Sequence, residues 1–141
     1  MKYLALVLMC SLAISSCSDK EPPSAQCNRA IIVSNTNYDK AKDESDFRIR
    51  DVSISGNCMT IEYSYGGGCG DIETELVAAE NSVQNTMNLP YRELKLSIDD
   101  NDNCEALITT SEDFDISALQ NEGNSTIIRL HKWDEEIIYA Y

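Results

Sequence analysis

Apolar and polar residues alternate over short segments along most of the chain. The clearest case lies at 59–65, where polar residues separate Met59, Ile61, Tyr63 and Tyr65. A period of two residues is that of a β-strand with one buried face. The segment 47–54 alternates as well, but its phase slips at Asp51, which indicates a β-bulge. Gly56 and Asn57 between the two segments are typical of a tight turn, so we predict a β-hairpin.

Other short segments repeat this alternation. They lie at 30–33, 72–76, 94–98, 106–108, 126–130 and 138–140, and we expect Thr126, Ile128 and Leu130 to face Ile138 and Ala140. The segment 35–46, with its asparagines and mixed charges, is expected to be a loop, and 114–119 to form one helical turn. No segment keeps a helical period for three turns. The pattern therefore predicts an all-β fold, a single small β-sandwich, Ig-like or barrel-like, of about seven or eight strands.

The first residues follow a different pattern. Lys2 is followed by an apolar run at 3–14 and by Ser15 and Ser16. This is the anatomy of a signal peptide, and the run is shorter than the roughly 20 apolar residues that span a bilayer. The ending Ile14-Ser-Ser-Cys17 resembles a lipobox, which implies cleavage before Cys17 and lipid on that cysteine. We expect a cleaved signal peptide at 1–16, a lipidated polar tether at 17–28 and a single β domain at 29–141.

The charge of the chain limits its partners. Lys and Arg number 11 against 24 Asp and Glu, for a net charge of -13. Such a surface repels nucleic acid and anionic lipid headgroups, so we expect neither as a partner. Small cations and basic protein surfaces are compatible with it. The expected attachment to a membrane therefore depends on the lipid at Cys17. Two or three acyl chains give stable membrane binding, whereas a single chain gives only reversible binding.

Cysteine use agrees with an envelope location. Once Cys10 leaves with the signal peptide and Cys17 takes lipid, four remain, Cys27, Cys58, Cys69 and Cys104. Four cysteines in an oxidising compartment favour two disulfides that brace the domain, with three possible connectivities. We favour Cys69–Cys104 and Cys27–Cys58, because a Gly-rich turn and an acidic loop each end a strand beside a cysteine. Zinc is disfavoured, since the chain has no Cys-x-x-Cys pair and a single histidine.

Three short motifs carry a resemblance. They are Tyr65-Gly-Gly-Gly-Cys69, Asp102-Asn-Cys-Glu-Ala106 and Phe114-Asp-Ile-Ser-Ala-Leu119. They resemble small uncharacterised lipoproteins of Bacteroidota over most of residues 47–141, and Ser18-Asp-Lys-Glu21 resembles the acidic signal that exports such lipoproteins to the cell surface. The resemblance implies the cell envelope, with the outer membrane as the site of attachment. It implies no catalytic or binding residue, because no activity is assigned to those proteins.

Candidate catalytic motifs are weak. The glycines at 66–70 would suit a phosphate-binding loop, but acidic residues follow them and no lysine does, so a tight connection is favoured. His131 is the only histidine, and it lies between two predicted strands, at an expected hairpin tip in solvent. Catalytic triads need a desolvated base and a third group that orients it. Trp133 beside it is expected to fold back over the same hairpin.

The densest acidic segment lies at 99–105. Asp99, Asn101, Asn103 and Glu105 alternate there and offer oxygen ligands of the kind that calcium takes. The glycine and the distal glutamate of an EF-hand loop are absent, since Cys104 and Thr110 occupy those places. Asp and Asn are also the usual residues of turns, and we favour a hairpin turn over a calcium site.

These observations favour a non-catalytic envelope lipoprotein that acts as a binding or accessory module, with the membrane and an envelope protein as partners. No motif for a cofactor is present, so none is expected. Two alternatives remain open, a small hydrolase and a disulfide-braced enzyme inhibitor that presents residues 66–70 to its target.

Overall fold

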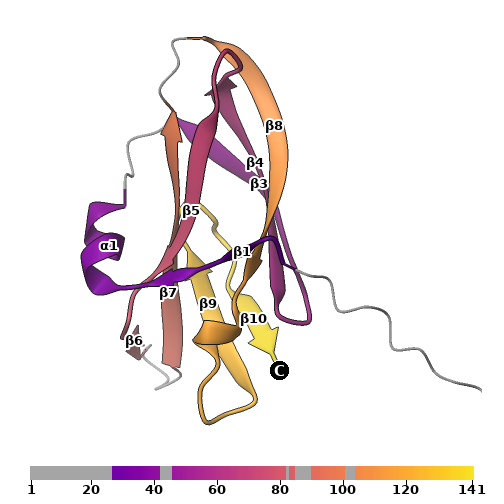
Figure 1. Cartoon of the computed structure of the whole chain (residues 1–141). Helices are drawn as coiled ribbons and strands as arrows, with labels where there is room; N and C mark the ends of the chain where they lie inside the picture. The colour runs from indigo at the N-terminus through magenta and orange to yellow at the C-terminus, as the bar shows by residue number, and fades with distance from the viewer. Residues whose placement is uncertain (1–26, 42–45, 82, 85–89, 101–103) are drawn as a thin grey trace, which may run out of the picture.

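The computed structural model describes residues 27–41, 46–81, 83–84, 90–100 and 104–141. The described chain forms two packed sheets (Figure 1). Sheet A has the order β1-β8-β4-β3, with β1 at Arg29–Ala30, β8 at Ala106–Asp115, β4 at Cys58–Gly67 and β3 at Phe47–Ser55. Sheet B has the order β10-β9-β7-β5-β2, with β10 at Ile137–Ala140, β9 at Ser125–Leu130, β7 at Pro90–Asp100, β5 at Ile72–Ala78 and β2 at Ile32–Val33. A short β6, Val83–Gln84, pairs with β7. The predicted all-β sandwich is confirmed, and seven of these strands have four or more residues.

The hairpin of β3 and β4 agrees with the alternation of the sequence. Ile49 lies opposite Tyr63, and Asp51 lies opposite Glu62, so Arg50 is an extra residue in β3. This is the predicted bulge, and it keeps apolar residues on the inner face on both sides of the slip. At the turn, Gly56 has a φ of +59°, a left-handed conformation that glycine adopts without a steric penalty.

The first described segment connects the two sheets. The apolar run predicted one strand at 30–33, but β1 pairs in parallel with β8 in sheet A, and β2 pairs in parallel with β5 in sheet B. In Figure 1 this segment crosses from β8 to the side of α1. Two strands of two residues each can change sheets in this way, because the chain between them only has to turn at Ile31.

The loop predicted at 35–46 was wrong in its first half. Residues Asn35–Lys40 form helix α1, and Ser34 caps it by accepting a hydrogen bond from the Asn37 backbone N–H at 3.3 Å. A serine in that position satisfies one of the amide groups that a helix leaves without a partner at its N-terminus. The helix has six residues, too few for a helical apolar period to reveal it.

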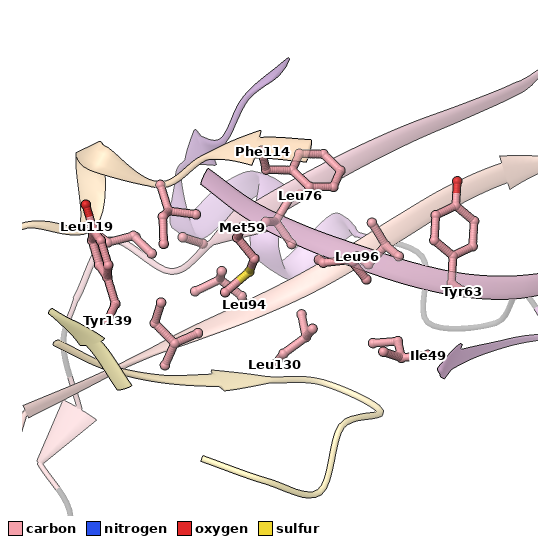
Figure 2. Close-up of a cluster of buried hydrophobic side chains, with 14 of the residues drawn as sticks. Ile49, Met59, Tyr63, Leu76, Leu94, Leu96, Phe114, Leu119, Leu130 and Tyr139 are labelled. Carbon is pink, nitrogen blue, oxygen red and sulfur yellow. The ribbon is translucent and has the colours of Figure 1, made fainter. Parts of the chain in front are cut away.

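Alternating side chains of both sheets form the core. Figure 2 shows Tyr63 and Ile49 at one end of this cluster and Leu119 and Tyr139 at the other. Its members are less than 10% exposed: Phe47, Ile49, Met59, Ile61, Tyr63, Leu76, Ala78, Leu94, Leu96, Ile98, Phe114, Ile116, Leu119, Ile128, Leu130 and Tyr139. Leu119 belongs to a single 3-10 turn at Ser117–Leu119, which confirms the one helical turn expected there.

The inward phase of β10 differs from the prediction. Ile137 lies opposite Ile128, and Tyr139 lies opposite Thr126, with Tyr139 fully buried and Ile138 72% exposed. The predicted inward residues, Ile138 and Ala140, therefore face solvent. Apolar residues occupy every position from 137 to 140, so alternation alone cannot choose between the two faces.

Two disulfides join Cys27 to Cys58 and Cys69 to Cys104, which is the pairing that the sequence favoured. Cys69 lies between β4 of sheet A and β5 of sheet B, and Cys104 lies between β7 of sheet B and β8 of sheet A. The second disulfide therefore links two connections that pass between the sheets. The hairpin turn predicted at 99–105 was wrong, because the strands on either side of it belong to different sheets.

Candidate binding surface

The residues proposed from the sequence are mostly dispersed. Cys17 and the predicted signal peptide lie outside the described residues, as do Asn101 and Asn103 of the calcium candidate. Asp99 lies on β7 opposite Glu73, and Glu105 is an exposed residue just before β8. Within the described ranges, no three His, Cys, Asp or Glu side chains gather in a way that would hold a metal ion. The calcium candidate, which the sequence disfavoured, therefore stays untested.

His131 and Trp133 lie where the hairpin of β9 and β10 turns. The His131 side chain is exposed, and its backbone N–H donates to Leu94 O at 2.8 Å. Trp133 is half-buried and packs against the core, as expected for a side chain that folds back over its hairpin. The loop is therefore held in place by its backbone and by its tryptophan.

The outer face of sheet A is hollowed along β4. Ser64 and Gly66 alternate with the inward residues of that strand, and both are small. Ser64 lies opposite Arg48 of β3, and Gly66 lies opposite Leu107 of β8. The small residues thus form the floor of a hollow of about 550 Å³, between walls formed by β3 and β8. We call this hollow the trough; its lining residues are Asp46, Phe47, Arg48, Arg50, Ser64, Gly66, Leu107 and Lys132.

Gly66 decides the depth of the trough. A Cβ built at this position meets no other atom within 4 Å, and the backbone φ is not left-handed. A larger side chain would therefore fit at Gly66 without strain and fill the trough. Gly68, by contrast, has a φ of +112° and is the residue where the chain leaves β4 toward Cys69. The Gly-rich segment has two roles, which its sequence alone did not separate.

The trough is basic in an acidic protein. Arg48, Arg50 and Lys132 line it with a single carboxylate, that of Asp46. Arg50 Nε donates to Ser64 Oγ at 2.5 Å, which places this guanidinium across the floor. Within the part of the chain that the structure describes, neither arginine has an ion pair with a carboxylate, whereas Arg129 pairs with Glu136. An arginine without such a partner keeps its forked donors available for an anionic ligand.

A second hollow of about 340 Å³ adjoins the trough. It shares Arg48 and Lys132 with the trough and is otherwise lined by Ile49, Trp133, Asp134 and Glu135. Lys132 has a φ of +66°, and its Nζ lies 4.1 Å from the centre of the Phe47 ring. This contact holds the loop between β9 and β10 against the start of β3. The two hollows therefore meet at a pair of cations, with apolar surface on each side.

A third hollow, of about 400 Å³, lies between α1 and the outer face of sheet B. Glu73, Glu75 and Asp99 line it together with Lys40. Its acidity matches that of the whole chain, so solvation of its carboxylates explains it without a ligand. The trough is the exception to the overall charge, and it is the better candidate for a binding site.

A polar bridge inside the sandwich joins the two sheets. The Tyr63 hydroxyl of β4 donates to Glu112 Oε1 of β8 at 2.9 Å, and the Thr74 hydroxyl of β5 donates to Glu112 Oε2 at 2.5 Å. Arg29 of β1 donates to Thr74 Oγ1 at 2.5 Å and lies 3.2 Å from Glu112 Oε2. In Figure 2 the Tyr63 hydroxyl points away from Ile49, at the edge of the core. We assign this bridge a structural role, because each polar group in it is bonded to another.

The bridge predicts a loss of stability at alkaline pH. Burial, together with the hydrogen bond to Glu112, raises the pKa of Tyr63 well above its ordinary value of 10. Above pH 10 the unfolded chain releases this proton and the folded chain keeps it, so the stabilisation present below pH 10 is lost as the pH rises, by about 1.4 kcal/mol per unit. Between pH 8 and pH 11, the free energy of unfolding, measured with urea, should fall less for the Tyr63→Phe variant than for the unchanged protein. Equal losses in the two proteins would contradict the assignment.

Comparisons with known proteins bear on the fold. No family model matches the chain, and no curated protein matches it. Among solved structures, a protein of unknown function, DUF1344, from Bacteroides vulgatus ATCC 8482 is similar, with a TM-score of 0.51 and 18% sequence identity. The match covers 80% of this chain and 55% of the Bacteroides protein, so this chain spans little more than half the length of that protein. At this identity the likeness supports the fold alone. A neighbour of unknown function from Bacteroides is consistent with the resemblance to uncharacterised Bacteroidota proteins.

One further finding concerns membranes. In the described ranges, no helix has the length and apolar character needed to cross a bilayer.

Proposed function

We propose that the protein is a non-catalytic lipoprotein of the cell envelope, anchored to the outer membrane through lipid on Cys17, and that it binds a partner through the trough. The observation that carries the anchor is the sequence Ile14-Ser-Ser-Cys17 after an apolar run of signal-peptide length. The binding role is supported by the trough, whose cations stand out in a chain of net charge -13.

The distance from the anchor to the fold suits a tethered domain. Cys27 is ten residues after Cys17, and its disulfide ties it to Cys58 at the start of β4. A fully extended chain spans about 3.4 Å per residue, so such a tether reaches at most roughly 35 Å. The lipid would thus hold the domain near the membrane while its sheets stay accessible to a partner.

The alternatives have less support. A hydrolase that uses a histidine base would depend on His131, but its side chain is exposed on the loop between β9 and β10, and not enclosed in a desolvated pocket. An inhibitor that presents residues 66–70 would need them as a protruding loop, but Gly66 and Gly67 belong to β4. Neither arrangement favours these functions over a binding module.

Replacement of Cys17 by serine tests the anchor. We expect the Cys17→Ser protein to move from the membrane fraction to the soluble fraction and to lose labelling by radioactive palmitate, because serine cannot carry the thioether-linked lipid. Cell fractionation followed by immunoblotting measures this. A Cys10→Ser protein is the matched control, since that cysteine lies within the signal peptide. If the Cys17→Ser protein stays in the membrane fraction, the anchor lies elsewhere in the chain.

A further inference from the structure

We propose that the trough binds a short acidic segment of a partner protein, with carboxylates on Arg48 and Arg50 and an apolar side chain on Leu107. This inference rests on the proposed binding function and names the chemistry of the partner. It follows from the position of two arginines and an exposed leucine on opposite walls of one hollow.

The charge of the trough selects a carboxylate ligand. Guanidinium groups bind carboxylates through two parallel hydrogen bonds, and such charge-assisted bonds are about twice as strong as neutral ones. Arg50 already uses Nε on Ser64, which fixes the direction of its side chain at no cost to a ligand that binds its other nitrogens. Arg48 faces the same hollow from the same strand. The bulge at Arg50 lets two neighbouring outward positions of β3 differ in direction, a frequent feature of binding sites on strands.

The apolar residues favour an acidic segment of a protein over other anionic ligands. Leu107 is 71% exposed, and in the described residues it is one of two large hydrophobic side chains with such exposure. An aliphatic wall beside two arginines suits a peptide that carries an apolar residue next to its carboxylates. Nucleic acid is repelled by the chain as a whole, whose net charge is -13. An acidic sugar would gain from an exposed aromatic ring, but the aromatic residue in the trough, Phe47, is buried.

The carboxylates around the two hollows limit how long the acidic segment of the partner can be. Asp46 lies in the trough, and Asp134 and Glu135 lie in the second hollow. The cations Arg48 and Lys132 lie where the two hollows meet. A ligand that crosses both hollows therefore places its carboxylates at the centre, and acidic residues toward its ends are repelled. Volumes of about 550 and 340 Å³ fall within the usual range for ligand sites.

Selection from a random nonapeptide library displayed on phage tests the proposal. The target is the mature chain from residue 17, purified with Cys17→Ser, and bound peptides are then synthesised and measured by calorimetry. We expect enrichment of Asp or Glu beside an aliphatic residue near the centre of the peptide. We expect an Arg48→Ala, Arg50→Ala double variant to weaken binding by at least 10-fold, and 0.5 M NaCl to weaken it as well, because exposed charge pairs are screened by salt.

Two further variants separate the trough from general electrostatics. Gly66→Leu fills the trough without a change of charge, and we expect it to abolish binding. Arg129→Ala removes a cation on sheet B, where Arg129 pairs with Glu136, and we expect it to leave binding unchanged. Circular dichroism checks that each variant folds. If the Gly66→Leu variant does not fold, binding by the double arginine variant decides whether the trough is the site.

Several outcomes would overturn the proposal. They are the absence of enriched acidic peptides, binding that survives loss of both arginines, and binding of an oligogalacturonate at the trough when no peptide binds there. None of these outcomes affects the test of the lipid anchor, because fractionation of the Cys17→Ser protein does not depend on the trough. The experiments therefore distinguish between two failures, that the trough does not bind an acidic segment and that Cys17 does not anchor the protein.

Discussion

Replacing both Cys69 and Cys104 by serine is expected to lower the free energy of unfolding by about 3 to 4 kcal/mol. The disulfide between them closes a loop with a sequence separation of 35 residues, and a cross-link of that length removes chain entropy mainly from the unfolded state. It also links the two connections between the sheets at one end of the sandwich. Without the disulfide, the unfolded chain gains conformational freedom. The strands of the folded chain keep their pairing.

Urea unfolding of a protein that starts at residue 17 and carries Cys17→Ser measures this effect. We expect the double variant to have a lower midpoint and a larger dependence on urea, because an unfolded chain without the cross-link exposes more surface. A Cys27→Ser, Cys58→Ser variant is the matched comparison, since that disulfide closes a loop of similar length, with a separation of 31 residues. A loss below about 1 kcal/mol for the Cys69 and Cys104 pair would contradict the entropic account.

Local patterns in the sequence predicted the parts of the fold that depend on neighbouring residues. The hairpin of β3 and β4 has a clear period of two, a Gly-Asn turn and one slip of phase, and the structure has each of these features. The bulge was visible because a misplaced phase in a half-buried strand would expose its apolar residues. The pairing of Cys69 with Cys104 was favoured because each lies beside the end of a predicted strand, although the sequence allowed three connectivities.

Other parts depend on contacts between distant segments. Helix α1 is too short to have an apolar period, and Ser34 as its cap resembles any serine before a polar loop. The segment 99–105 has the composition of a turn, but composition does not reveal that β7 and β8 lie in different sheets. The face of β10 was misassigned because four apolar residues in succession do not alternate.

The trough was not predicted, and its origin explains why. It needs the pairing of Ser64 with Arg48 and of Gly66 with Leu107, across three strands. The glycines at 66–68 were noticed, but their sequence is equally typical of a turn. One signal was available, namely two arginines at 48 and 50 on a predicted strand of an acidic chain, which places them on the same face of a sheet.

Glu112→Ala is expected to lower the free energy of unfolding by about 2 to 4 kcal/mol, although its side chain is 22% exposed. The carboxylate accepts hydrogen bonds from Tyr63 and Thr74, whose side chains are at most 4% exposed. Removing it leaves two buried hydroxyls without that acceptor, and each costs about 1 to 2 kcal/mol in the absence of a replacement. The ion pair with Arg29 adds little, because the Arg29 side chain is 45% exposed.

Asp113→Ala provides the matched control for Glu112→Ala. Asp113 is the next residue of β8, faces the outer side of sheet A and accepts a hydrogen bond from Thr60 at 2.6 Å. Since solvent reaches both groups of that pair, we expect a loss of about 1 kcal/mol or less. A cycle with Tyr63→Phe then isolates the Tyr63–Glu112 contact, and we expect a coupling of about 1 to 2 kcal/mol. If Glu112→Ala costs no more than Asp113→Ala, the bridge between the sheets contributes no more to stability than a surface hydrogen bond.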